Sequence, residues 1–293
     1  MNKVLVIIVT YNAHDWIHQC LNSIDMERYD AFVVDNASSD DTLQILQTEY
    51  PKAIVRAVDK NLGFGQANNI GLRYALDNGY DYVFLLNQDA WLLPDTIERL
   101  IVAQKQNPEY WVLSPLQMNT EQGGVERTFN TYVNRFKVDL NSTTTCDVGF
   151  CNAALWLVSI ECIKTIGGFD PIFPHYGEDT DFLQRVSYHK GKIGVLPNVK
   201  AYHEHKPPAD FNEDRMIYRT KLVFMGVMKN INYSMFLCIC QLFFYLMKRI
   251  VKAVYTLQFN NVKKDFLAFC EALKEYQEIK KRRKLTKWNP VYL

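Results

Sequence analysis

Short polar segments follow four apolar, strand-like runs in the first ninety residues. They occupy residues 10–12, 35–40, 61–69 and 87–89. A carboxylate at the end of a buried strand, as Asp35 would be, can accept hydrogen bonds from a ribose or a base. Gly63 and Gly65 would let the backbone approach a phosphate closely. Asp89 is a hard oxygen ligand suited to Mg²⁺ or Mn²⁺ on a diphosphate. These residue types would together serve a nucleoside diphosphate.

A second acidic group, Glu178-Asp179-Thr180-Asp181, follows Gly177 at the predicted start of a helix. A carboxylate there can take a proton from a hydroxyl group. The positive end of the helix dipole favours the ionised form, so we expect a carboxylate that accepts protons but is a weak base. Arg185 stands four residues after Asp181, at ion-pair spacing, which indicates a mostly structural role for Asp181.

Each of these signals has a plainer interpretation. Asp35-Asn36 could form an ordinary Asx turn, and a lone Gly-x-Gly is more often a turn than a phosphate cradle. Asp89 could simply end a strand, and the acidic group 178–181 could cap an ordinary helix. Their co-location at one edge of a predicted sheet favours a ligand site.

The first hundred residues alternate between strand-like and helix-like patterns. We predict strands at 4–9, 31–34, 53–58 and 82–86, and helices at 15–24, 42–50, 66–78 and 94–106. Such alternation with short connections is typical of a parallel sheet covered by helices on both faces. Ligands of such sheets bind at the carboxyl ends of the strands, where the polar segments lie.

The pattern after residue 110 is less regular. Residues 111–117 and 129–138 are predicted as strands, and 141–145 as a polar loop. Ser159 caps a short helix that ends at Gly167, and 178–190 forms another helix. Two short strands follow at 192–196 and 199–203, and the chain is helical from about 212 to 284.

The motifs occur in an order that resembles the inverting family-two glycosyltransferases of GT-A fold, in particular their bacterial rhamnosyltransferase-like branch. They are Val9-Thr10-Tyr11-Asn12, Val34-Asp35-Asn36-Ala37-Ser38-Ser39-Asp40, Asn61-Leu62-Gly63-Phe64, Asn68-Asn69, Leu86-Asn87-Gln88-Asp89, Gly167-Gly168-Phe169-Asp170, Glu178-Asp179-Thr180-Asp181 and His203-Glu204. The resemblance covers residues 3–210. It implies an α/β fold, a Rossmann-like mixed sheet flanked by helices. Residues 1–110 would bind the nucleotide sugar, 111–211 the acceptor, and 212–293 would form a helical extension.

The resemblance also assigns site residues. The donor-binding set would be Thr10, Tyr11, Asp35, Asn36, Asn61, Gly63, Phe64, Asn68, Asn87, Gln88 and Asp89. Asp89 matches the last residue of the family's Asp-x-Asp metal motif, and His203 would complete the shell of an Mg²⁺ or Mn²⁺ ion. Because the triplet here is Asn-Gln-Asp, the donor phosphates would hold more of the metal. Asp179 would be the catalytic base with Glu178 beside it. The alternative for His203 is a solvent-facing side chain next to His205.

The implied reaction moves a sugar from a nucleoside-diphosphate sugar to an acceptor hydroxyl with inversion. The acceptor would be a cell-surface polysaccharide or a lipid-linked glycan, and residues 149–155 would line its side of the cleft. Two alternatives stay open: a catalytically weak nucleotide-sugar-binding protein, and a sugar-phosphate nucleotidyltransferase. The second is disfavoured because residues 10–14 contain no glycine.

Composition limits the partners. A net charge of +1 offers no general field for nucleic acid, although residues 248–293 hold 12 Lys and Arg against 4 Asp and Glu. Seven scattered cysteines indicate free thiols in a cytoplasmic protein. No run approaches the roughly 20 apolar residues that span a bilayer. Residues 232–293 could touch the inner face of a membrane, pack on the catalytic domain, or join a second subunit in a homo-oligomer.

Overall fold

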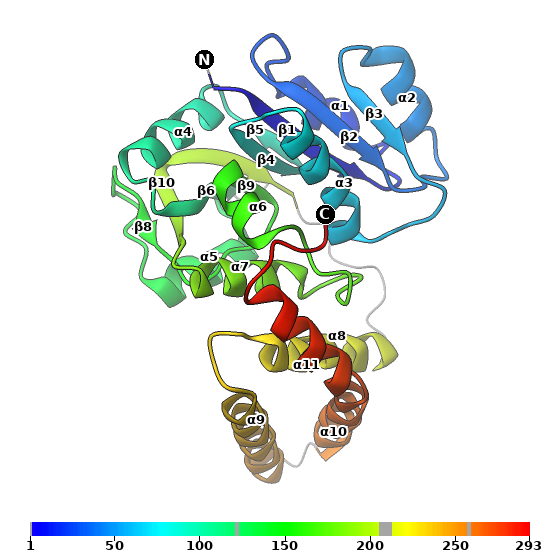
Figure 1. Cartoon of the computed structure of the whole chain (residues 1–293), viewed down its shortest axis with the longest axis vertical. Helices are drawn as coiled ribbons and strands as arrows, with labels where there is room; N and C mark the ends of the chain where they lie inside the picture. Colours follow the sequence, from blue (N-terminus) through cyan, green and yellow to red (C-terminus); the bar gives the residue numbers. More distant parts are fainter. Residues whose placement is uncertain (1, 121–122, 205–212, 257–258) are drawn as a thin grey trace.

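The computed structural model describes residues 2–120, 123–204, 213–256 and 259–293. These residues form a ten-stranded mixed sheet with helices on both faces, and a group of C-terminal helices extends from one end (Figure 1). Two apolar clusters fill the spaces between the sheet and its helices, and a third lies among the C-terminal helices. The predicted mixed α/β sheet with a helical extension is confirmed.

The first half of the sheet is parallel, as predicted. Its strands run in the spatial order β3 (Ile54–Ala57), β2 (Asp30–Asp35), β1 (Val4–Thr10) and β4 (Tyr82–Asn87). The intervening helices are α1 (Ile17–Asn22), α2 (Thr42–Glu49), α3 (Phe64–Asp77) and α4 (Thr96–Gln106). Residues 4–8 of β1 are at most 1% exposed because both faces of the strand are covered. This two-sided burial explains the unbroken apolar run.

The second half of the sheet mixes directions. Strand β9 (Leu155–Ser159) is antiparallel to both of its neighbours, β4 and β6 (Tyr110–Asn119). Strand β10 (Lys192–His203) runs parallel to β6, and the short β5 (Ala90–Leu92) covers the outer edge of β10. Strands β7 (Gly124–Val125) and β8 (Cys146–Asp147) add short pairs. The two strands predicted at 192–196 and 199–203 are one strand with a register shift between them.

One prediction was wrong: residues 129–138 do not form a strand. Helix α5 (Arg127–Phe136) occupies them instead. The Glu126 carboxylate caps this helix by accepting hydrogen bonds from the backbone N–H groups of Thr128 and Phe129, at 2.9 and 2.7 Å. Phe129 and Val133, four residues apart, are buried on one face. The β-branched and aromatic composition favours a strand, but the cap and the helical spacing of the buried residues prevail.

The two helices that follow β9 form as predicted. Helix α6 (Ile160–Ile166) begins where the Ser159 hydroxyl accepts from the backbone N–H of Cys162 at 3.3 Å. It ends at Gly167, whose φ is +76°. A Cβ on this glycine would lie 2.0 Å from the carbonyl oxygen of Val291, so the returning C-terminus leaves room for glycine alone. Helix α7 (Glu178–Tyr188) follows.

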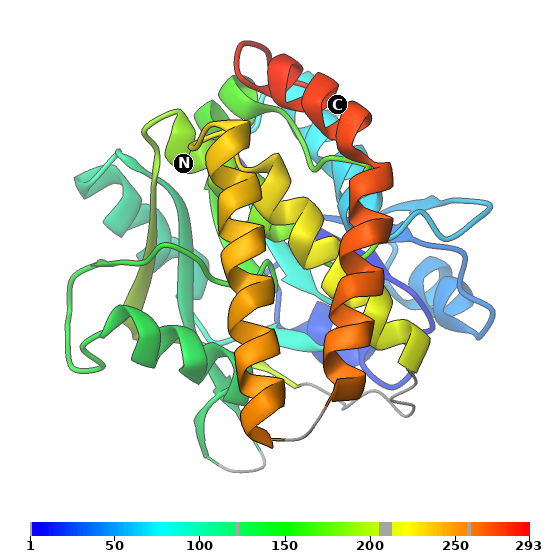
Figure 2. The same ribbon diagram turned by 90° about the horizontal axis from the view of Figure 1, so that it is seen from below.

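The C-terminal extension contains α8 (Glu213–Lys229), α9 (Met235–Thr256), α10 (Phe259–Lys274) and α11 (Tyr276–Thr286). Helices α9 and α10 lie side by side over α8, which faces the sheet domain (Figure 2). After α11 the chain returns to the body, where the N–H of Gly168 donates to Val291 O at 2.8 Å. Among the described residues, no helix is both long enough and apolar enough to cross a bilayer.

Candidate functional site

The ends of β1 and β2 meet through a buried carboxylate. Asp35 is 1% exposed and accepts hydrogen bonds from the Thr10 hydroxyl at 3.1 Å and the Ser38 hydroxyl at 2.5 Å. The backbone N–H of Ser38 also donates to it, at 3.2 Å. Buried carboxylates persist where donors surround them in this way. The contacts give the Asp35 carboxylate one orientation at the carboxyl edge of the sheet.

Two asparagines shape the loop that follows β3. Asn36 Nδ2 donates to Asn61 Oδ1 at 3.0 Å, and the Leu62 N–H donates to Asn36 Oδ1 at 2.8 Å. This arrangement places Gly63 at a φ of +79°. A Cβ there would lie 1.8 Å from the carbonyl oxygen of Pro174, so only glycine permits the close approach of the two loops. The predicted donor loop therefore packs directly against the loop that precedes α7.

The remaining predicted donor residues lie either at the ends of β1 and β4 or in the first turns of α3. Gln88 holds the backbone of Tyr11, accepting from its N–H at 2.7 Å and donating to its carbonyl at 3.3 Å. The Tyr11 side chain stays exposed at the same edge, where β4 ends at Asn87. Phe64 and Asn68 lie in the first turns of α3, where Asn68 Nδ2 donates to Phe64 O at 2.9 Å. The amide of Asn68 thus makes a contact within its own helix.

Asp89 and His203 are neighbours because β5 pairs with β10. The register sets Ala90 opposite His203, and Asp89 Oδ1 lies 3.5 Å from His203 Nε2. His203 is fully buried, and its other ring nitrogen, Nδ1, lies 3.1 Å from Gln117 Oε1. An amide oxygen only accepts, so Nδ1 carries a proton, and Nε2 is the ring nitrogen that faces Asp89. The predicted alternative, a solvent-facing His203, is wrong. His205 lies outside the described residues.

This pair fits a divalent cation. Two ligands that each lie about 2.1 Å from one ion are at most about 4.2 Å apart, so a 3.5 Å separation allows both to bind the same ion. The second ring nitrogen is oriented by an amide, as is usual for metal-bound histidines. In the described part of the chain no cluster of three or more His, Cys, Asp or Glu side chains forms a complete metal site. A cation here would need oxygen atoms from the donor.

Glu178 and Asp179 lie at the start of α7, where Glu178 is buried and Asp179 is partly buried. Burial raises the pKa of Asp179 to about 6, against opposing hydrogen bonds from the N–H and hydroxyl of Thr180 at 2.6 and 3.3 Å. Burial, with the Asp179 charge beside it, raises the pKa of Glu178 to about 8. Our expectation of a weak base is therefore wrong, because burial outweighs the helix dipole.

Residues 149–155 run between the surroundings of Asp179 and the end of β4, close to Asp89. The Cys151 thiol lies within electrostatic range of Asp179: burial, together with that carboxylate, raises the pKa of Cys151 to about 12. Ala154 follows Cys151 by three residues, and its carbonyl oxygen accepts a hydrogen bond from the backbone N–H of Asn87 at 2.9 Å. Asn87 stands two residues before Asp89 in the chain. Three residues span at most about 11 Å. The segment 149–155, predicted to line the acceptor side, thus connects the two carboxylates.

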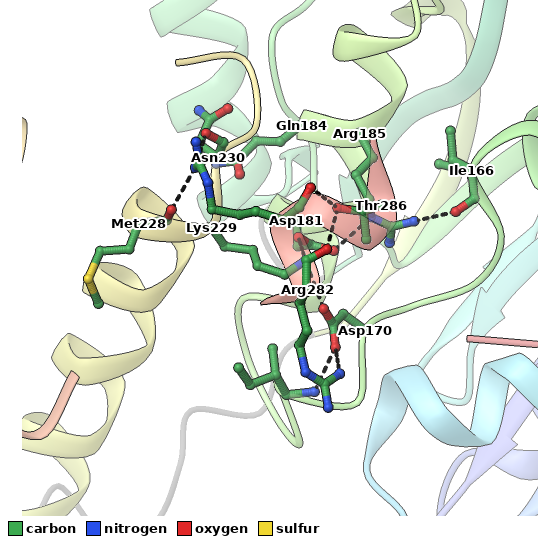
Figure 3. A network of polar contacts seen from close by, with 12 residues as sticks. Ile166, Asp170, Asp181, Gln184, Arg185, Met228, Lys229, Asn230, Arg282 and Thr286 are labelled. Carbon is green, nitrogen blue, oxygen red and sulfur yellow. Dashed lines mark hydrogen bonds and ion pairs between the residues drawn. The ribbon is translucent and has the colours of Figure 1, made fainter. Parts of the chain in front are cut away.

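A buried ionic network holds α7, the helix that carries Glu178 and Asp179, in place (Figure 3). Lys229 Nζ lies 2.8 Å from Asp170 Oδ2 and 2.8 Å from Asp181 Oδ1, and all three side chains are at most 2% exposed. Asp181 also pairs with Arg185 at 2.8 Å, which confirms the predicted i,i+4 contact. Arg282 of α11 bonds to the other oxygen of Asp170. The C-terminal extension is thereby joined to the start of α7.

Sequence reasoning missed several of these residues. Gln117 lies inside a correctly predicted strand, and a polar side chain among apolar neighbours is the signal that would have identified it. Lys229 ends a helix of mixed composition, so nothing near it in sequence indicated a buried cation. Tyr132 was assigned to a strand, whereas its position in α5 puts it close to Asp179, whose charge adds to burial in raising the pKa of Tyr132 to about 12.

Comparison with known proteins finds one matching family model and relatives of similar sequence. Residues 5–167, more than half of its length, match the family model described as Glycosyl transferase family 2. A Mycobacterium tuberculosis protein named N-acetylglucosaminyl-diphospho-decaprenol L-rhamnosyltransferase is 26% identical over 242 residues, covering 70% of this chain and 77% of that protein. The dTDP-rhamnosyl transferase RfbF of Shigella flexneri is 22% identical over 207 residues, 69% of each chain.

Solved structures share the fold. The mannosyltransferase PcManGT from Pyrobaculum calidifontis, in complex with GDP-Man and Mn²⁺, aligns with a TM-score of 0.60 at 17% identity over 92% of this chain and 87% of its own. S. aureus TarS 1–349, in complex with UDP-GlcNAc, aligns with a TM-score of 0.58 at 18% identity over 80% and 69%. These likenesses confirm the expected GT-A architecture.

Proposed function

This chain belongs to glycosyl transferase family 2, and from that premise we propose its substrates and the roles of its residues. The chain is an inverting glycosyltransferase that uses a nucleoside-diphosphate sugar. We propose dTDP-L-rhamnose as the donor and a saccharide linked through diphosphate to a polyprenyl lipid as the acceptor. Both choices are supported by the names of the two relatives. Residues 1–110 form the donor half of the catalytic domain in this proposal, and 111–211 the acceptor half.

Our proposed donor site lies along the carboxyl edge of β1, β2 and β4. The carboxylate of Asp35, oriented by Thr10 and Ser38, receives hydrogen bonds from the ribose or base. Tyr11 and Asn36 border the same position, and the loop with Asn61, Gly63, Phe64 and Asn68 closes the pocket around the sugar. In the proposal, Asn87 ends β4 beside the diphosphate, and Gln88 holds the backbone of Tyr11 there through two hydrogen bonds. The dense contacts among these residues support the proposal because a pre-organised site loses little conformational freedom on binding.

Asp89 and His203 would hold Mg²⁺ or Mn²⁺ together with the donor diphosphate. When bound, the cation neutralises the charge that develops on the departing diphosphate. The protein's own contribution is orientation: Gln117 keeps the proton of His203 on Nδ1, so that Nε2 faces Asp89. One carboxylate and one imidazole bind a cation weakly, and the donor completes the site.

The raised pKa of Asp179 is the single observation that carries the mechanism. With a pKa of about 6, Asp179 is ionised at neutral pH and is still basic enough to take a proton from an acceptor hydroxyl as that oxygen attacks the anomeric carbon. With a pKa of about 8, Glu178 stays mostly neutral and can donate a hydrogen bond to the acceptor. Opposed protonation states in adjacent carboxyl groups are typical of divided catalytic roles.

The proposal is tested first by donor binding and then by transfer. Thermal unfolding is followed with dTDP-L-rhamnose, UDP-GlcNAc and GDP-mannose, each with and without Mn²⁺. We expect stabilisation by the first of these, and Mn²⁺ should enlarge it, because a ligand that binds the folded state alone raises its stability. Transfer to a prenyl-diphosphate saccharide follows. Binding without any transfer would favour a catalytically weak nucleotide-sugar-binding protein.

We also propose that the extension, residues 232–293, touches the inner face of a membrane where a lipid-linked acceptor lies. Helix α9 exposes large apolar side chains, including Phe236, Phe243, Phe244 and Tyr255. Lys248 and Lys252 are exposed on the same helix. Exposed apolar groups beside lysines suit the surface of an anionic bilayer, where each basic residue adds about 1 kcal/mol.

Vesicle sedimentation tests this contact. Phe243→Ser with Phe244→Ser should reduce binding to phosphatidylglycerol vesicles, whereas Val102→Ser, an exposed position on α4, should not. Truncation at residue 232 is a poor test because it removes Arg282 from the network around Asp170. Unchanged vesicle binding, together with loss of a dimer in light scattering, would assign the face to a second subunit.

A further inference from the structure

A cavity of about 630 Å³ lies beside α7 and is separate from the donor edge. Its lining comes from α5, from residues 149–150, from α7 and from the turn between α8 and α9. Thr180, Leu183, Gln184 and Ser187 contribute one face of α7 at helical spacing. The adjacent face of α7 carries Asp181 and Arg185, which belong to the ionic network. In Figure 3, Gln184 lies beside Asn230, whereas Arg185 points toward Ile166.

The cavity begins next to the catalytic base. Thr180 lines it, and the backbone N–H and hydroxyl of Thr180 both bond to Asp179. Tyr132 lines the opposite wall, and the Asp179 charge adds to burial in raising the pKa of that phenol. A ligand in the cavity would therefore lie along α7, starting at Thr180, the residue next to the base. Its size falls within the roughly 300–1,000 Å³ that small-molecule sites occupy.

One buried polar atom in the lining lacks a partner. Gln184 Oε1 has no solvent contact and accepts no hydrogen bond from the residues that the structure describes. A buried acceptor without a donor is costly, so such atoms in native proteins call for a ligand or a bound water. The backbone carbonyl of the same residue accepts from Asn232 Nδ2 at 2.8 Å, which holds the turn between α8 and α9 against α7.

The other walls combine aromatic rings with one positive charge. Tyr132 and Phe150 meet edge to face with ring centroids 5.1 Å apart, and Tyr233 is partly exposed at the turn. Arg135 is the single charged side chain among the described lining residues. Aromatic faces, an amide acceptor and a guanidinium suit a ligand with apolar C–H surfaces, hydroxyl donors and an anionic group.

We propose that this cavity binds the saccharide of the acceptor, a proposal that rests on the glycosyl transfer proposed above. The Gln184 amide, once Oε1 turns toward the cavity, accepts a hydrogen bond from a sugar hydroxyl, and the rings of Tyr132 and Phe150 pack on the sugar. Arg135 pairs with the phosphate that joins the saccharide to its lipid. Tyr233 leads directly into α9, so a lipid chain leaving the cavity meets the exposed apolar face of that helix.

Two variants test the site with defined probes, N-acetylglucosaminyl diphosphate on a short prenyl chain and free N-acetylglucosamine. Gln184→Leu should raise the acceptor KM at least about fivefold for both probes. Arg135→Met should raise it about tenfold for the diphosphate probe only. Gln44→Leu on the exposed face of α2 and Arg73→Met on α3 are matched controls. Slow hydrolysis of the donor without acceptor should be unchanged in the two control variants.

The outcomes separate this proposal from the one on which it rests. If wild-type protein transfers sugar but neither Gln184→Leu nor Arg135→Met changes the acceptor KM, the cavity is not the acceptor site although the enzyme is a transferase. If no donor is hydrolysed or transferred, saturation-transfer NMR with the diphosphate probe still decides. Binding that Gln184→Leu weakens supports the cavity, and binding unaffected by both variants overturns it. The unfolding temperature of Gln184→Leu should not fall, because the change removes an unpaired polar atom.

Discussion

Glu178 offers a test of the site that needs no substrate. Its pKa of about 8 lies well above the ordinary value of 4.5, because the folded protein buries the carboxyl group beside Asp179. Between these two pH values the folded state binds more protons at this position than the unfolded state does. Stability therefore falls as pH rises through this interval, by up to 1.36 kcal/mol per pH unit.

Glu178→Gln removes this dependence because a neutral amide stands in for the protonated acid. From pH 5 to pH 7 the variant should gain about 2.5 kcal/mol of unfolding free energy relative to wild type. For a chain of 293 residues that corresponds to a gain in unfolding temperature of about 4 °C. At pH 5 the two proteins should unfold at nearly the same temperature, since Glu178 is mostly protonated there.

The assay is thermal unfolding of both proteins at half-unit steps from pH 5 to pH 7 in one buffer system of constant ionic strength. Glu161→Gln, at an exposed first-turn position of α6, is the matched control and should stay parallel to wild type. Parallel curves for wild type and Glu178→Gln would show that Glu178 is ionised in the fold. The division of roles between Glu178 and Asp179 would then be wrong.

Three further predictions concern the same site. Asp179→Asn should abolish transfer and leave donor binding intact, and the wild-type kcat/KM should fall about tenfold per unit below pH 6 as Asp179 is protonated; retained turnover would remove Asp179 from the base role. Lys229→Met should lower the unfolding free energy by about 3–5 kcal/mol in denaturant titrations, because Asp170 and Asp181 lose a buried partner; a loss below 1 kcal/mol would contradict the network. His203→Gln should weaken Mn²⁺ binding with donor present at least about tenfold by calorimetry, and equal affinities would exclude His203 as a ligand.

Much of this architecture is local information that the sequence carries. Residues 4–9 form a strand because an unbroken β-branched run can be buried on both faces, and the polar residues after each strand then collect at one edge. Asp181 and Arg185 pair because four residues make one helical turn. Patterns of this range predicted the polar edge of the sheet and the acidic helix start, whereas the pairing of Asp89 with His203 came from the resemblance to the family.

The tertiary structure alone decided how these parts act together. Strand β5, three residues long, brings Asp89 to His203, and no periodicity can mark so short an element. Lys229 meets Asp170 and Asp181 across about fifty residues of chain, because burial selects partners by space and not by sequence distance. The same burial raises the pKa of Asp179, whereas the helix start alone predicted the opposite direction. Sequence therefore supplies the chemical groups and their local geometry, and packing sets the dielectric environment in which they react.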